Sequence, residues 1–189
     1  MTRNSCQLLV FIVPYFLAMT ACAQKSPTVT MRDQTFQVTD RSFYMGMSDW
    51  TCGPTEIDHE NTLEQIRLHG DLICFQFDDG VPWPEAYASS SYGEDLREKI
   101  LGRKLRLTKD QKIYLEIGAL DAERSHITGY WADTGGQPRP APWDSLAIDD
   151  PKMIIAYANY CNDLIAQFQP TFVNYSLKCT DFLLNAPND

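Results

Sequence analysis

Carboxylates and all four tryptophans of the chain gather in three polar segments, residues 48–59, 78–92 and 119–149. A carboxylate accepts hydrogen bonds from sugar hydroxyls, and an indole ring covers the apolar face of a sugar. These residue types favour an oligo- or polysaccharide as the ligand. The candidate substrate-binding residues are Asp49, Trp50, Asp78, Asp79, Trp83, Glu85, Arg124 and Trp131.

Several of these residues also have an ordinary structural interpretation. Asp78 and Asp79 precede a glycine, which is common turn chemistry, and their carboxylates could instead bind a cation. Trp83 stands between two prolines and could be either a sugar platform or a packing residue. Arg124 could clamp a carboxylate or stabilise its own loop through an ion pair.

The charge balance and the histidines argue against two classes of partner. Asp and Glu number 25 against 16 Lys and Arg, a formal net charge of -9, so contact with a nucleic-acid backbone is disfavoured. His59, His69 and His126 do not have the spacing of metal ligands. We therefore expect no nucleic-acid partner, no metal and no other cofactor.

The remaining segments must position these candidate residues. The short apolar segments that predict strands are residues 43–48, 72–77, 112–118 and 171–177. Helices are expected from a cap at Asn61 or Thr62 to Gly70, from residue 94 to 105, and from Asp150 to Pro170. Apolar side chains at helical spacing predict a buried face on the last helix, made of Ile154, Tyr157, Cys161, Leu164 and Phe168.

The alternation of strands and helices predicts an α/β fold with a parallel sheet. The connections after the strands are long, whereas a doubly wound sheet usually has short ones. In a (β/α)8 barrel such loops stand at the carboxyl ends of the strands, where active sites are built. We therefore expect four parallel strands in sequential order, curved as the first half of a TIM-type barrel. Glu116, in mid-strand, needs a partner if it is buried, and we expect a salt bridge.

Four cysteines lie in the body of the chain, and none forms a C-x-x-C pair. They are Cys52, Cys74, Cys161 and Cys179. An oxidising compartment would permit disulfides between them without requiring any. Cys74 and Cys161 lie in apolar periodic segments, so we expect both to be unpaired core residues.

Residues 1–22 have the pattern of an export signal. Arg3 precedes an apolar run, residues 8–19, that is too short to span a bilayer comfortably. The small residues before Cys22 resemble the lipobox of bacterial lipoproteins, in which that cysteine is lipidated and becomes N-terminal. Alternatively, Ala21 to Ala23 is an A-x-A site that releases a soluble protein beginning at Gln24. Both predict export to the bacterial cell envelope, with residues 23–41 as a linker and 42–189 as the folded domain.

The segment from Phe77 to Ala86 reads FDDGVPWPEA. It resembles the loop after the second strand, FDGGVPWPEA, in a group of bacterial (β/α)8-barrel glycoside hydrolase-like proteins related to the endo-galactanase type. The resemblance spans roughly residues 43–185 and includes Tyr44–Gly46, Arg124-Ser125, Tyr130-Trp131, Pro142-Trp143 and Asp150-Pro151. It implies a glycosidase with an acid/base Glu after strand four and a nucleophile Glu after strand seven.

The chain departs from this family in two ways. Where the family reads Gly-Ile-Glu-Val-Asn-Glu at the end of strand four, this chain has residues 176–181, which place Lys178 at the acid/base position. A lysine cannot alternate between acid and base near neutral pH as a carboxyl does. The chain also has 189 residues, whereas about 250 are typical of such a barrel. Asp181 is the nearest carboxylate and thus the one candidate catalytic residue.

These departures lead to three hypotheses. The first is the amino-terminal half of a glycoside hydrolase-like envelope protein, either a truncated product, a fragment or half of a dimeric barrel, which is inactive alone. The second is a non-catalytic sugar-binding lipoprotein, suggested by Lys178. The third is an envelope protein that self-associates through its open sheet edges.

The export signal yields a first prediction. We expect Cys22 to carry lipid in the native host and to anchor the protein to the membrane, because small residues precede it and the apolar run is short. Mass spectrometry of the mature amino terminus measures this directly. An unmodified chain that starts at Gln24 would exclude the lipoprotein but not export.

Overall fold

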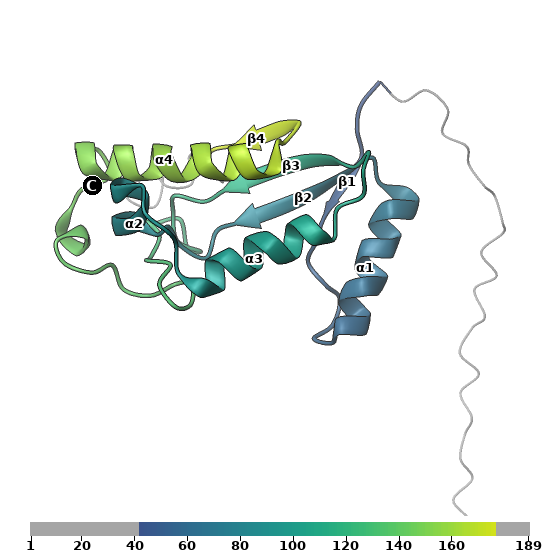
Figure 1. Cartoon of the computed structure of the whole chain (residues 1–189), viewed down its shortest axis with the longest axis horizontal. Coiled ribbons are helices and arrows are strands. Elements are labelled where there is room, and N and C mark those ends of the chain that lie inside the picture. Colours follow the sequence, from purple (N-terminus) through teal and green to yellow (C-terminus); the bar gives the residue numbers. More distant parts are fainter. Residues whose placement is uncertain (1–41, 177–189) are drawn as a thin grey trace, which may run out of the picture. The chain divides into compact units, whose positions relative to one another are not determined.

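The computed structural model describes residues 42–176, which form an α/β unit built on one parallel sheet. Its strands are β1 (Gly46–Ser48), β2 (Leu72–Phe77), β3 (Lys112–Ile117) and β4 (Phe172–Asn174). All three pairings are parallel, and the spatial order is β1-β2-β3-β4 (Figure 1). The connections contain α1 (Glu56–His69), α2 (Trp83–Ala88), α3 (Glu94–Leu105), a 3-10 turn (Trp143–Ser145) and α4 (Pro151–Phe168). The sequential parallel order confirms the predicted fold class, the first half of a (β/α)8 barrel.

The two faces of the sheet have different surroundings. Phe168 of α4 contacts the rings of Phe75 and Phe77, with ring centroids 5.5 and 5.6 Å apart. Arg103 of α3 lies over the same two rings. The two helices therefore cover one face, the outer face. Side chains alternate along a strand, so the opposite, inner face carries Cys74, Gln76 and their neighbours in register, Tyr114, Glu116, Phe172 and Asn174.

The sheet curves around its inner face. Tyr44, just before β1, and Phe172 of β4 belong to the two edges of the sheet, yet their ring centroids are 5.8 Å apart. The amino group of Lys112, on β3, lies 5.0 Å from the centre of the Tyr44 ring. Because flat edge strands would be three strand spacings apart, about 14 Å, this contact requires the edges to bend toward each other.

The first helix starts earlier than the sequence predicts. Thr55, not Asn61 or Thr62, is its N-cap, because Thr55 and Asp58 form a reciprocal capping box. Thr62 lies inside the helix and donates its hydroxyl hydrogen to the carbonyl of Asp58. Helix α2 lies in a segment expected to be loop. A local capping box sets the start of α1, whereas α2 buries Trp83 and Ala86 and packs on α4.

The other elements match the prediction more closely. Helix α3 has the predicted bounds, and α4 starts at Pro151 after an Asp150 cap, as expected. The buried face of α4 is rotated from the prediction and consists of Met153, Ala156, Tyr160, Cys161, Leu164 and Phe168. Ile154 is 55% exposed, and Tyr157 is half-buried. At 100° per residue, position 154 falls on the margin of the apolar stripe. The described strands at the two edges are also shorter than predicted.

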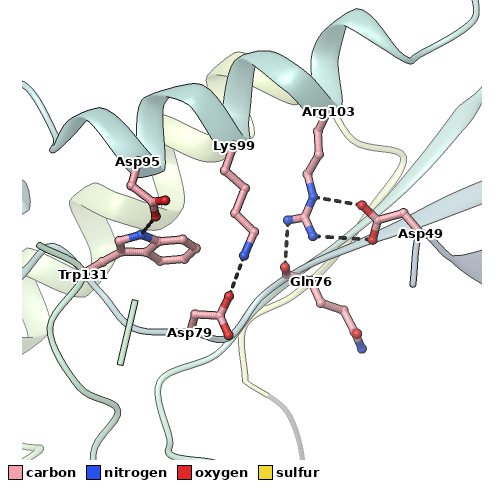
Figure 2. Close-up of polar contacts among 7 residues, drawn as sticks. All are labelled: Asp49, Gln76, Asp79, Asp95, Lys99, Arg103 and Trp131. Atoms are coloured by element: carbon pink, nitrogen blue, oxygen red, sulfur yellow. Dashed lines mark hydrogen bonds and ion pairs between the residues drawn. The ribbon is translucent and has the colours of Figure 1, made fainter. Parts of the chain in front are cut away.

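Helix α3 is tied to the strand ends by one buried ion pair (Figure 2). The Arg103 guanidinium donates to the Asp49 carboxylate at 3.0 and 3.4 Å, and to the backbone oxygen of Gln76 at 2.7 Å. The Arg103 and Asp49 side chains are only 9% and 8% exposed. One side chain thus joins α3 to β2 and to the end of β1.

This arrangement yields a stability prediction. Replacing Arg103 by Met leaves the Asp49 charge buried without its partner, so we expect the free energy of unfolding to fall by about 3–5 kcal/mol. Arg106→Met is the matched control, because Arg106 forms only an exposed pair with Glu56, and a loss of about 0–1 kcal/mol is expected. Urea unfolding followed by circular dichroism measures both.

A double variant separates charge burial from packing. Adding Asp49→Asn to Arg103→Met removes the unpaired charge, so part of the lost stability should return. Equal losses in Arg103→Met and Arg106→Met would contradict the structural role of the buried pair.

Candidate functional site

The centre of the candidate site is a buried carboxylate on the inner face. Glu116 of β3 accepts a hydrogen bond from Gln76 Nε2 at 2.6 Å and another from Asn174 Nδ2 at 3.0 Å. The three residues are Cα partners across β2, β3 and β4. Glu116 itself is 4% exposed. Within residues 42–176 its partners are two neutral amides and no cation, so the predicted salt bridge is wrong.

A second carboxylate follows on the same side. Asp78 comes two residues after Gln76, beyond the end of β2, and within residues 42–176 its carboxylate has no hydrogen-bond or ionic partner. Gly118 permits this placement, because a Cβ atom at position 118 would lie 3.0 Å from the Cα and Cβ atoms of Asp78. The carboxyl end of the inner face therefore presents one carboxylate held by amides and one that is free to accept.

The next inner-face row, two residues closer to the amino ends of the strands, carries small or aromatic side chains. Cys74 is a half-buried free thiol, flanked in register by Ser48 and Tyr114. Burial, with the negative charges of Glu116 and Asp49 adding to it, raises the pKa of the Cys74 thiol to about 12. Cys161, on α4, is also a free thiol, as expected. The thiol of Cys74 is therefore a neutral group at physiological pH.

Three predicted site residues pair with α3 instead of facing the inner side (Figure 2). Asp49 is in the ion pair with Arg103. Asp79 accepts from the Lys99 amino group at 2.5 Å. Trp131 is buried and donates its indole N–H to Asp95 at 2.7 Å, with the Lys99 amino group 4.6 Å from its ring centre. These side chains hold the loops in place.

Three further predicted residues serve the loops in a similar way. Trp83 is buried, donates to the backbone oxygen of Gly129 and stacks on Trp143, so packing describes its role. Glu85 accepts from the Tyr130 hydroxyl at 2.6 Å. Arg124, in the left-handed backbone region at φ 59°, donates to the backbone oxygen of Asp121. It stabilises its own loop, although through a carbonyl rather than an ion pair.

The structure thus separates the predicted residues into two groups. Asp78 belongs to the inner-face cluster, and Trp50, at the end of β1, presents a ring that is 67% exposed. The other described candidates are engaged with helices or loops. Asp181, Lys178 and Cys22 lie outside the described residues.

Sequence reasoning missed Gln76 and Asn174. A signal for them exists, because β2, β3 and β4 each carry one uncharged or acidic polar residue near the carboxyl end of an otherwise mostly apolar strand. Aligning the strands on that residue would have placed Gln76, Glu116 and Asn174 in one row.

Two cavities of ligand size lie away from the inner face. One of about 480 Å³ is mainly apolar and lies beside α4, where Met153, Ile154 and Tyr157 line it. Another, of about 590 Å³, contains Asp79 and Lys99, which pair with each other. Neither Glu116 nor Asp78 lines either of these two cavities.

The described part of the chain has neither a cluster of metal-binding side chains nor a membrane-spanning helix. No group of three or more His, Cys, Asp or Glu side chains suited to a metal ion occurs within residues 42–176. None of the helices in that part of the chain is both long and apolar enough to cross a membrane.

The raised pKa of Cys74 yields a chemical prediction. The thiolate is the reactive form, so iodoacetamide at pH 8 should modify the exposed Cys52 and leave Cys74 and Cys161 almost unmodified. Glu116→Gln removes a negative charge near Cys74, so its alkylation should become faster. Peptide mass spectrometry of the folded protein measures each site. Equal alkylation of Cys52 and Cys74 in the folded protein would contradict the burial of the inner layer.

Comparisons with known proteins do not identify a family for this chain. No family model, no curated protein and no solved structure matches it.

Proposed function

We propose that the chain is a carbohydrate-binding, glycoside hydrolase-like protein of the bacterial cell envelope, and that by itself it binds a sugar without cleaving it. The observation that carries this proposal is the inner-face cluster, in which Gln76 and Asn174 hold the Glu116 carboxylate next to Asp78, whose carboxylate has no partner within residues 42–176. It lies at the carboxyl ends of the strands, where barrel enzymes bind their ligands.

The chemistry of the cluster suits hydroxyl groups. Glu116 uses one lone pair of each oxygen on an amide, so each oxygen can accept a further hydrogen bond. Asp78 can accept at both oxygens. Fixed acceptors at neighbouring positions match the adjacent hydroxyls of a sugar ring, and the exposed Trp50 ring offers an apolar surface near the same end of the sheet.

The absence of cleavage follows from the carboxylates that glycoside hydrolysis needs. One must protonate the leaving oxygen, and the other must act as nucleophile or base from the opposite side of the sugar. Within one chain, Glu116 lies on β3 and Asp78 lies just beyond the end of the neighbouring β2, so both approach a ligand from the same side. By the resemblance in the sequence, Lys178 stands where the acid would be.

The location in the envelope rests on the amino-terminal pattern around Cys22. An exported protein meets polysaccharides of the cell surface or the surroundings. A lipid anchor would hold a sugar-binding site at that surface.

A binding titration tests the proposal. We expect the chain to bind oligosaccharides saturably in calorimetric titrations of a panel that includes β-galacto-oligosaccharides. Asp78→Asn should weaken binding at least tenfold, about 1.4 kcal/mol, because an amide that replaces a carboxylate loses a charge-assisted hydrogen bond. Assays for released reducing ends should detect no turnover.

The matched control is Asp110→Asn, which makes the same change of charge on an exposed residue before β3, at the opposite end of the sheet. Its affinity should equal that of the unmodified chain. Lack of binding to every sugar in the panel, or equal weakening by both variants, would refute the proposed site. Robust hydrolysis that Asp181→Asn abolishes would instead make Asp181 the acid.

A further inference from the structure

The sheet of the described unit has two open edges. Its order is β1-β2-β3-β4, so β1 and β4 each have one neighbour within residues 42–176. Unpaired strand edges present rows of free backbone donors and acceptors that pair readily with another strand. Each of these two edges can therefore pair with a strand of a partner.

The backbone of β1 shows which groups point outward. Asp49 donates its N–H to the Cys74 oxygen, and Met45 accepts from the Leu72 N–H, so the backbone groups of odd-numbered residues point toward β2. Because successive residues alternate, the N–H and C=O groups of Ser48 point to the open side. On β4, Thr171 donates to Ile113, which by the same argument leaves Phe172 and Asn174 with outward groups.

Large apolar side chains accompany both edges. The exposed ones on or next to β1 are Phe43, Tyr44, Met45, Met47 and Trp50, and those on or next to β4 are Phe172 and Tyr175. Exposed apolar groups that are contiguous, unlike single ones, mark an interaction surface. Here they adjoin strand edges that can form hydrogen bonds.

We propose that a second copy of this chain closes the barrel, with β4 of each copy pairing with β1 of the other, and that the partner copy completes the inner-face site with its own Glu116. The open edges of β1 and β4, the curvature shown by the Tyr44–Phe172 contact and the polar inner face carry this proposal.

The strand directions fit this closure. Both edge strands run parallel to the rest of the sheet, and a two-fold axis along the axis of the barrel keeps all strands parallel. The resulting ring has eight strands in the order β1-β2-β3-β4 repeated twice. Such a ring has no open edge, and its inner face becomes a barrel interior.

The same closure places the two Glu116 residues on opposite sides. In the ring the two β3 strands are four positions apart, so they are diametrically opposed. A sugar at the carboxyl end would then lie between two carboxylates, each held by its own Gln76 and Asn174. The acid position implied by the resemblance is Lys178 in both copies, so the dimer is also expected to bind the sugar without cleaving it. This part rests on the proposed function and predicts one sugar molecule per two chains.

Sedimentation equilibrium of the full chain tests the closure. We expect twice the mass of one chain over a wide range of concentrations. Hydrogen exchange should show protection of the outward amide groups of Ser48 and Asn174, although neither donates to a neighbouring strand within residues 42–176. A monomer at all concentrations would overturn the proposal.

Two variants locate the interface. Ser48→Pro removes an outward N–H without removing a β1–β2 hydrogen bond, and Tyr175→Lys puts a charge on an exposed residue next to the β4 edge. Each should raise the dissociation constant of the dimer at least tenfold. Leu105→Lys is the control for the second variant, because Leu105 is an exposed apolar residue on α3 and away from both edges. Circular dichroism verifies that each variant is folded.

The outcomes separate closure from sugar binding. A dimer that neither edge variant weakens would associate through another surface, and closure would be refuted. A dimer that binds one sugar per chain would refute the shared site but not the closure. A dimer that both variants weaken and that binds no sugar would support the closure and refute the proposed function.

Discussion

The register of the sheet depends on one buried carboxyl group. Glu116 is 4% exposed, and Gln76 and Asn174 offset the cost of burying it by donating to it from the neighbouring strands. A slip of one residue along either neighbour would turn the amide to the outer face, toward α3 and α4, and would leave the carboxylate without a partner. Apolar side chains on the inner face would specify the register less strictly. The polar row therefore determines how β2, β3 and β4 align.

The two faces of the sheet have different roles. The outer face buries phenylalanines under α3 and α4 and provides the hydrophobic stability of the unit. The inner face has an aromatic contact at its amino end, a thiol and a tyrosine in the middle, and carboxylates with amides at its carboxyl end. Polarity therefore increases toward the end at which the long loops leave the strands. A ligand with many hydroxyls would meet its acceptors only from that side.

The sequence predicts elements well where local signals and apolar periodicity coincide. Helix α4 has a proline after its cap and a clear stripe, and the bounds of α3 and the parallel order also agree with prediction. The start of α1 depends on a capping box in a polar stretch, which periodicity does not reveal. The partners of Trp83 and Trp131 lie in loops distant in sequence, so the burial of these rings follows from tertiary contacts. Glu116 finds its partners 40 and 58 residues away.

One helix connects three loops. Asp95, Lys99 and Arg103 are spaced by four along α3, and they hold Trp131 after β3, Asp79 after β2 and Asp49 after β1 (Figure 2). A helix is stiff along its axis, so these loops cannot open one at a time without breaking an ion pair or a hydrogen bond. We expect their openings to be coupled through α3, so that hydrogen exchange in them follows one cooperative opening. Three loops that open together lose little conformational entropy when a ligand binds.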